Sequence, residues 1–182
     1  MSHLYRRILL GLVLLAACLV PFHSRSENKV YSSTKHGVRI AFPADWTVVG
    51  PTETDVWTAY GKLKGNFVGC FVRRAKIHGT EGATPDDFLS RVTEADYAKL
   101  NSITIPDIKI HLFDVVLLGG LKARRVIYSG TEGQFQMGNV VHKTIHGGES
   151  IAVGCQSFQS KFSMVANDFH AIISTFEFIR RR

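Results

Sequence analysis

Residues 108–158 decide the fold, and they read IKIHLFDVVLLGGLKARRVIYSGTEGQFQMGNVVHKTIHGGESIAVGCQSF. Apolar and polar residues alternate through much of this stretch, as they do in strands that bury one face of a sheet. Glycine-containing turns interrupt it at residues 119–120, 130–133 and 147–148. Glycine supplies the positive φ that tight hairpin turns need. The pattern predicts four consecutive antiparallel strands.

Further elements flank these four strands. Residues 38–42, 55–60 and 66–74 read as earlier strands, and the last of them is apolar on both faces. We therefore expect it to be a central strand that is covered on both sides. A helix is predicted over residues 84–101, since Thr84 is a suitable cap and is followed by a proline and two acids.

A second helix is predicted near the end of the chain. Apolar residues recur at spacings of three and four between Phe162 and Phe176, and residues 176–179 could add a short edge strand. Strands, a helix, four more strands and a final helix fit an α+β fold, an antiparallel β-sheet with helices on its faces. Trp46 directly follows the first predicted strand and is expected to fill the core.

The first 26 residues predict an export signal. Arg6 and Arg7 precede an apolar run of 13 residues, which Pro21 ends. A membrane-spanning helix needs about 20 apolar residues, so this run is too short to remain as a span. The pattern is typical of a signal peptide. We expect residues 1–26 to act as this signal and residues 27–182 to form one exported, periplasmic domain.

Two processing routes fit the signal. A Leu-Ala-Ala-Cys motif ends at Cys18, as in bacterial lipoprotein signals, which would make Cys18 a lipidated membrane anchor. Alternatively, Ser24 and Ser26 supply the small residues that a signal peptidase reads, with cleavage after Ser26. The sequence leaves both routes open.

The charge of the exported part gives little support for a nucleic-acid partner. The chain has 22 basic and 15 acidic residues, a formal net charge of +7. Three of the basic residues and none of the acids precede residue 27, which leaves 19 bases against 15 acids, or +4. These charges are scattered, so no nucleic-acid partner is expected.

Two cysteines lie in predicted strands of the exported part, Cys70 and Cys155. An oxidising compartment permits a disulfide between them. The alternative is two buried thiols on different strands. The sequence does not establish the short Cα separation that a disulfide requires.

No group of side chains in the sequence specifies catalysis. His142 and His146 would lie about 13 Å apart on a strand, too far to share one metal ion. Ser150 resembles the nucleophile of a hydrolase, with Asp168 and His170 in a suitable chain order. A nucleophile elbow needs a strand before it and a helix after it, whereas Ser150 opens a strand after a glycine turn. We predict no catalytic residue, metal or cofactor.

Basic residues in two of the predicted strand regions could form a patch if those regions lie side by side. The residues are Arg73, Arg74, Lys76, Lys122, Arg124 and Arg125. The alternative is scattered, solvated charge.

The segment HGVRIAFPADW at residues 36–46, the capped middle helix, the glycine-interrupted strands and the end of the last helix resemble PsbP-like proteins. That superfamily includes the extrinsic PsbP subunit of photosystem II, a Ran-binding nuclear import factor, DcrB-type bacterial envelope lipoproteins and type VI secretion adaptor chaperones. The resemblance implies an α/β/α sandwich that serves as a binding or assembly module without catalysis. An exported member is most similar to the DcrB type.

The resulting functional hypothesis is a non-catalytic exported envelope protein that binds another protein or helps to assemble a complex. The alternative is a small-molecule carrier with a cleft lined by residues such as Trp46, Trp57 and Phe71. An open apolar cleft of several hundred Å³ would favour the carrier. A hydrolase is the third hypothesis.

Overall fold

The structure is a computed structural model that describes residues 27–52, 55–76 and 82–180. The predicted signal segment, with Cys18 and both processing routes, lies outside the described residues.

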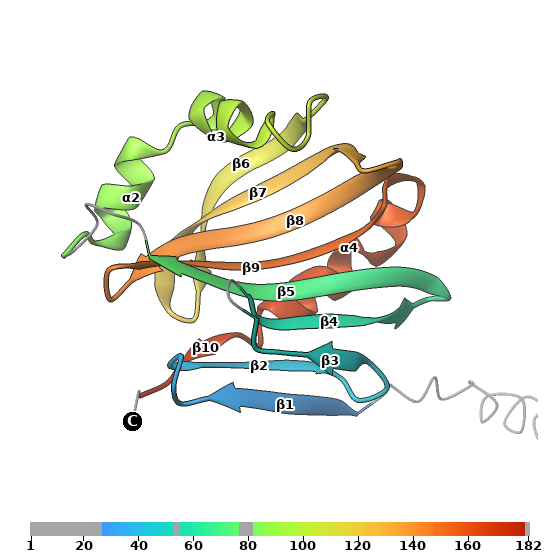
Figure 1. Cartoon of the computed structure of the whole chain (residues 1–182), viewed down its shortest axis with the longest axis horizontal. Coiled ribbons are helices and arrows are strands. Elements are labelled where there is room, and N and C mark those ends of the chain that lie inside the picture. Colours follow the sequence, from blue (N-terminus) through green and yellow to red (C-terminus); the bar gives the residue numbers. More distant parts are fainter. Residues whose placement is uncertain (1–26, 53–54, 77–81, 181–182) are drawn as a thin grey trace, which may run out of the picture.

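The described residues form two antiparallel sheets (Figure 1). The larger sheet has the strand order β3-β4-β5-β9-β8-β7-β6. Its strands are β3 (Thr47–Val49), β4 (Asp55–Leu63), β5 (Asn66–Lys76), β6 (Lys109–Leu118), β7 (Leu121–Glu132), β8 (Phe135–His146) and β9 (Glu149–Phe158). The smaller sheet has the order β1-β2-β10, with β1 (Asn28–Ser33), β2 (Val38–Pro43) and β10 (Glu177–Phe178). The four predicted consecutive strands are confirmed as β6 to β9.

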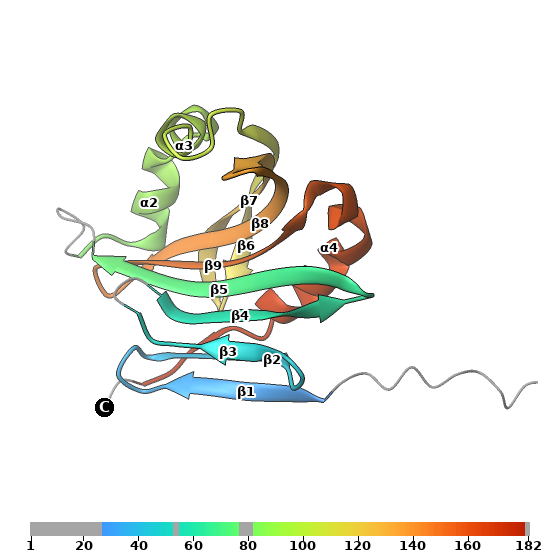
Figure 2. The same cartoon turned by 45° about the vertical axis from the view of Figure 1, so that its right-hand side comes forward.

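Helices cover both faces of the larger sheet (Figure 2). They are α2 (Pro85–Arg91), α3 (Glu94–Asn101) and α4 (Gln159–Ile173). Helix α4 packs on β8 and β9, whereas α2 contacts β7 and β8, and α3 contacts β6. Consecutive side chains of β8 point to opposite faces of the sheet. Val140 belongs to the core beneath α4, whereas Val141 belongs to the core beneath α3. The predicted α+β fold with helices on the sheet faces is therefore confirmed. Within the described ranges, no helix is both long and apolar enough to cross a membrane.

The single helix predicted over residues 84–101 is wrong, because the segment forms two helices. Thr84 caps the first as predicted, in a reciprocal pair of hydrogen bonds with Asp87. Thr93 repeats this capping box with Asp96 and begins a second helix. The backbone of Thr93 is extended, with φ −84° and ψ 165°, so the first helix cannot continue through it.

The core between α4 and the two sheets contains the predicted tryptophan. Trp46 is buried and its ring stacks on Phe42, with ring centroids 6.2 Å apart. Gly61 of β4 makes room for it, because a Cβ atom there would lie 2.2 Å from the indole ring. Phe169 of α4 is also fully buried in this core.

Strand β5 is covered on one face only, contrary to the prediction. Val68 and Val72 are buried in the core on the α4 side. On the other side, Phe71 is half-buried and Phe67 is exposed. Helices α2 and α3 contact β6, β7 and β8 and leave this face of β4 and β5 open. The open face is where the groove described next is found.

Candidate functional site: a groove between the sheet and two helices

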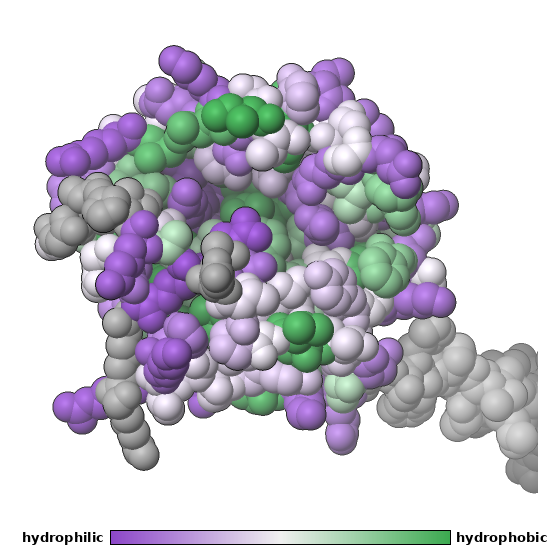
Figure 3. All heavy atoms as spheres, in the orientation of Figure 1, coloured by the Kyte–Doolittle hydropathy of each residue, from purple (hydrophilic) through white to green (hydrophobic). Residues whose placement is uncertain are grey.

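A groove lies between the open face of β4 and β5 and the helices α2 and α3. Figure 3 shows it as a hollow with apolar atoms in its floor and polar residues around it. It consists of a polar cavity of about 470 Å³ and an apolar cavity of about 300 Å³. The two are adjacent, because Phe71, Arg73, Asn101 and Tyr128 line both.

The polar cavity contains one ion pair and one carboxylate that accepts a hydrogen bond from a neutral amide. Arg73 donates a hydrogen bond from Nε to Asp55 Oδ1 at 2.7 Å, within an ion pair between β5 and β4. Glu132 accepts a hydrogen bond from Asn139 at 2.8 Å. Gln156 of β9 adds a polar side chain to the same lining. This cavity therefore offers hydrogen-bonding groups, and Glu132 leaves it with one net negative charge.

The apolar cavity brings both helices together with the centre of the sheet. Its lining includes Phe88 of α2, Tyr97 of α3, and Val141 and Ala152 of the sheet. Ala152 is paired with residues on both neighbouring strands, and its small side chain leaves space above the sheet. The result is an aromatic and aliphatic chamber beside the polar cavity.

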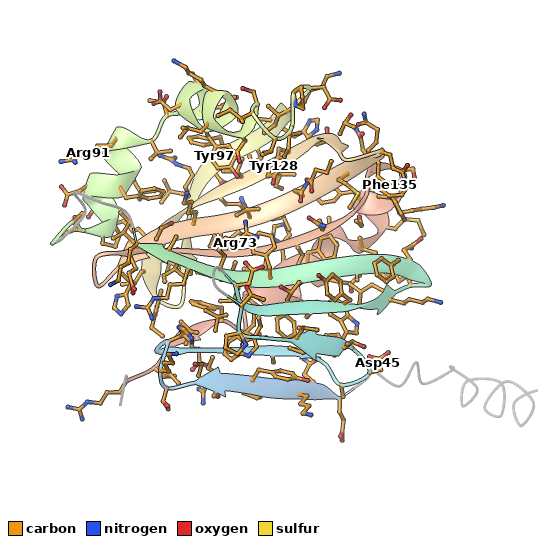
Figure 4. All side chains as sticks on the ribbon, in the orientation of Figure 1. Asp45, Arg73, Arg91, Tyr97, Tyr128 and Phe135 are labelled. Atoms are coloured by element: carbon orange, nitrogen blue, oxygen red, sulfur yellow. A yellow bond between two sulfur atoms is a disulfide. The ribbon has the colours of Figure 1, made fainter. Side chains whose placement is uncertain are left out.

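Two tyrosines meet between the cavities. The rings of Tyr97 and Tyr128 have centroids 6.0 Å apart. Burial raises the pKa of Tyr97 to about 12 and raises the pKa of Tyr128 as well. Both hydroxyl groups therefore remain protonated near neutral pH. Figure 4 shows this pair beneath α3, with Arg73 across the groove on β5.

A row of charged side chains crosses the floor of the groove. In the strand register, Ala152 lies opposite Arg73 on one side and Lys143 on the other, and Lys143 lies opposite Arg124. Burial lowers the pKa of Lys143, and the positive charge of Arg73 lowers it further. Lys143 lines the apolar cavity, and its Nζ lies 6.0 Å from the ring centroid of Phe88.

Four exposed aromatic residues form a row at one end of the groove, which we call the aromatic row: Tyr60, Phe67, Phe135 and Phe158. They are 39–56% exposed. Tyr60 lines the polar cavity. Each of the other three residues is an even number of positions along its strand from a residue that lines one of the cavities. They therefore lie on the same face of the sheet as the groove. The rings pair as Tyr60 with Phe67 and Phe135 with Phe158, with centroids 6.5 and 5.4 Å apart. Exposed apolar groups that gather in this way typically mark a binding surface.

The structure does not assemble the hydrolase triad considered from the sequence. Ser150 opens β9 and lines the apolar cavity. Asp168 and His170 belong to α4, which packs on the opposite face of the sheet. Asp168 pairs with Lys64 at 2.8 Å. The sheet therefore separates the serine from the proposed base.

The two histidines of β8 have different neighbours. His146 contacts the ring of Phe178, with centroids 4.4 Å apart. His142 is buried beneath α4, and its ring centroid lies 6.1 Å from that of His170. In the part of the chain that the structure describes, no group of three or more histidine, cysteine or acidic residues could hold a metal ion.

The basic patch considered from the sequence is not formed. Strands β5 and β7 are separated by β9 and β8. Arg74 pairs with Glu149 and Arg125 with Asp114, whereas Arg73 faces the groove. Lys143 was missed, although a lysine between the apolar residues Val141 and Ile145 of a predicted strand was a usable signal.

Cys70 and Cys155 are direct partners in the register of β5 and β9. Their Cα atoms are 4.0 Å apart and their sulfur atoms 1.99 Å apart, and both residues are buried. The arrangement supplies the short separation that the sequence could not establish. Formation of the disulfide in the exported protein stays a prediction.

The cleft expected for a small-molecule carrier is present, but two of its three predicted residues lie elsewhere. Trp46 and Trp57 are buried in the core on the α4 side. Phe71 lines both cavities. Tyr97 and Tyr128 take the place that the tryptophans were expected to fill.

No family model matches the sequence, and no curated protein matches it. Solved structures do match. The solution structure of PsbP from the cyanobacterium Synechocystis is 15% identical, with 86% of this chain and 95% of that chain covered and a TM-score of 0.59. The crystal structure of LpqN, involved in cell envelope biogenesis of Mycobacterium tuberculosis, is 8% identical, with 87% of each chain covered and a TM-score of 0.53.

The Ran-binding protein Mog1p of Saccharomyces cerevisiae also matches. It is 8% identical, with 85% of this chain and 97% of that chain covered and a TM-score of 0.55. Likeness at this level of identity concerns the fold. Together, these comparisons show that the chain shares its fold with PsbP, LpqN and Mog1p.

Proposed function

We propose that the protein is a non-catalytic exported binding protein that holds an extended segment of a partner protein of the cell envelope in its groove. The single observation that carries this proposal is the open groove with four exposed aromatic side chains at its mouth. An enclosed site for a small ligand buries most of that ligand's surface. A groove that continues onto an exposed aromatic row suits a longer chain, which can extend beyond the cavities.

The composition of the mouth supports a protein partner. Aromatic residues are enriched where proteins bind one another, and exposed aromatic clusters are uncommon elsewhere on protein surfaces. The polar cavity adds hydrogen-bonding side chains, Gln156 and Thr58 among them, close to Tyr60. A bound segment would therefore find apolar contacts at the mouth and polar contacts deeper in the groove.

The solved structures with this fold support a binding role by analogy. One of them is Ran-binding and another is involved in cell envelope biogenesis. The predicted signal over residues 1–26 favours the cell envelope as the place of action. Lipidation of Cys18 would anchor the protein there, and intact-mass measurement of the processed protein distinguishes this from cleavage after Ser26.

The proposal is tested by site-specific photocrosslinking in intact cells. A benzophenone amino acid replaces Phe67 in the aromatic row or, as the control, Val30 of β1. Both positions are exposed, at 56% and 58%. We expect a discrete crosslinked partner from position 67 and none from position 30. The same adducts from both positions, or none from position 67, would contradict a docking role for the aromatic row.

A small-molecule carrier remains the second candidate, because cavities of about 470 and 300 Å³ are large enough for a ligand. Native mass spectrometry of the protein purified from the envelope distinguishes the two. A bound small molecule, together with no crosslinked protein at position 67, would favour the carrier.

A further inference from the structure

We infer that the apolar cavity is a binding site for the free carboxylate and apolar side chain of a polypeptide's C-terminal residue, with Lys143 as the residue that recognises the charge. This inference rests on the proposed function, because it names the chemistry of the segment that the groove holds.

Of the three cations in the row across the groove floor, Lys143 alone has no anionic or hydrogen-bonding partner among the described residues. Arg73 is neutralised by Asp55. Arg124 donates a hydrogen bond to the carbonyl of Leu89 at 2.9 Å, and its guanidinium group lies 4.3 Å from the ring centroid of Phe113. Lys143 therefore has the positive charge that is available to a ligand.

The lining of the apolar cavity contains Lys143 and no aspartate or glutamate. A partly desolvated charge without a partner is unfavourable, and a ligand anion offsets that cost when it enters. Because Arg73 is already paired, one net positive charge remains. This charge count matches a carboxylate with a single negative charge better than a phosphate group with two.

The remaining lining indicates what accompanies the carboxylate. Phe88, Val92, Tyr97 and Val141 provide aromatic and aliphatic contacts, and Ala152 leaves space between Arg73 and Lys143. A cavity of about 300 Å³ is at the small end of ligand-binding sites and suits one residue with a large apolar side chain.

The adjacency of the two cavities is the reason for assigning the carboxylate to the end of a chain. Tyr128 and Asn101 line both cavities, so a ligand in the apolar cavity can continue into the polar one. The polar cavity reaches Tyr60, which belongs to the aromatic row. A terminal residue bound at Lys143 would therefore place the preceding residues along the groove and toward its mouth. Capture of a terminal carboxylate is a recurring mode of peptide recognition.

The test is calorimetric titration of the processed protein with matched peptides at pH 7. The probes are acetyl-Gly-Ser-Gly-Phe with a free carboxylate, the same peptide as its amide, acetyl-phenylalanine alone, and inorganic phosphate. We expect the acid to bind at least about tenfold more tightly than the amide, a difference of about 1.4 kcal/mol, because only the acid carries the negative charge that Lys143 contacts. Acetyl-phenylalanine should bind more weakly than the tetrapeptide.

The variants assign the effect to Lys143. Lys143→Met should remove the preference for the acid, whereas Lys143→Arg should retain a preference for the acid. Lys161→Met is the matched control, because Lys161 is exposed on α4, which packs on the other face of the sheet. Thermal unfolding of each variant verifies that it is folded.

Several results would overturn the inference. Lys143 would not recognise the carboxylate if the wild-type protein bound acid and amide equally. The same conclusion would follow if folded Lys143→Met kept the full preference for the acid. Competition by phosphate at the same concentration as the peptide acid would contradict a carboxylate site. Acetyl-phenylalanine binding as tightly as the tetrapeptide would contradict the chain-end source. If position 67 crosslinked to a partner but the protein bound the peptide acid and its amide equally, only this inference would be wrong and the proposed function would still be supported.

Discussion

Acid should destabilise this protein through His142. The side chain is 7% exposed, and neither ring nitrogen has a hydrogen-bond partner within the described part of the chain. The charged groups facing it are His170 of α4, Arg125 of β7 and Asp114 of β6. Burial, then His170 and Arg125, lower the pKa of His142 to about 4, while Asp114 opposes this effect. The native protein therefore holds this histidine neutral.

The sign and size of the effect follow from linkage. Above pH 6.5, the histidine is neutral in both the native and the unfolded protein and adds no pH dependence. Between pH 6.5 and about 4, His142 binds a proton in the unfolded chain but not in the native protein, so stability falls as pH falls. At about 1.36 kcal/mol per pKa unit, the full loss is about 3 kcal/mol below pH 4. The pKa of His170 is lowered in the same direction, mainly by burial.

Urea unfolding at pH 7, 5.5 and 4 measures this loss in the wild-type protein and in His142→Phe. The variant replaces the ring by an apolar ring of similar size that cannot bind a proton. Between pH 7 and 4, the free energy of unfolding should fall less in the variant than in the wild type. The difference between the two losses should be about 3 kcal/mol. His170→Phe should reduce the acid sensitivity as well. Identical pH dependence of wild type and His142→Phe would refute the reasoning.

Three further results are expected. Denatured, processed protein should have no reactive thiol before reduction, and two thiols would disprove the disulfide. Replacing Cys70 and Cys155 by alanine should lower the free energy of unfolding by about 4–5 kcal/mol, because the two cysteines are 85 positions apart in the chain. Phe169→Ala should cost about 3–5 kcal/mol in urea unfolding, since the ring is fully buried, and a loss below 1 kcal/mol would argue against this core. Phe135→Ser combined with Phe158→Ser should change stability by less than about 1 kcal/mol yet abolish partner crosslinking from the benzophenone at position 67; retained crosslinking would contradict the role of these rings.

The strand pattern explains why the main architecture was predictable. Glycines at 119–120, 133 and 147–148 break an alternating pattern into four strands, and short connections between such strands make them neighbours. Thr84 with Asp87 was readable as a helix start for the same local reason. The repeat of this signal at Thr93 and Asp96 was equally local, and recognising it would have divided the helix correctly.

The groove was not predictable because it depends on contacts between distant segments. Alternation shows which residues share a face of one strand, but not that β5 pairs with β9 rather than with β6. That pairing places β4 and β5 beyond the reach of α2 and α3 and leaves Phe71 beside a cavity. Lys143 and Tyr97 come together there from a strand and a helix more than 40 positions apart in the chain.

If the groove holds the partner, a large side chain that fills the groove should weaken partner binding. Ala152→Trp places a large ring in the apolar cavity, and Ala171→Trp makes the same change on the exposed surface of α4. The measurement is the affinity of each folded variant for the partner recovered by crosslinking at Phe67. We expect Ala152→Trp to weaken binding by roughly 30-fold, about 2 kcal/mol, and Ala171→Trp to bind as the wild type does. Unchanged affinity in Ala152→Trp would contradict it.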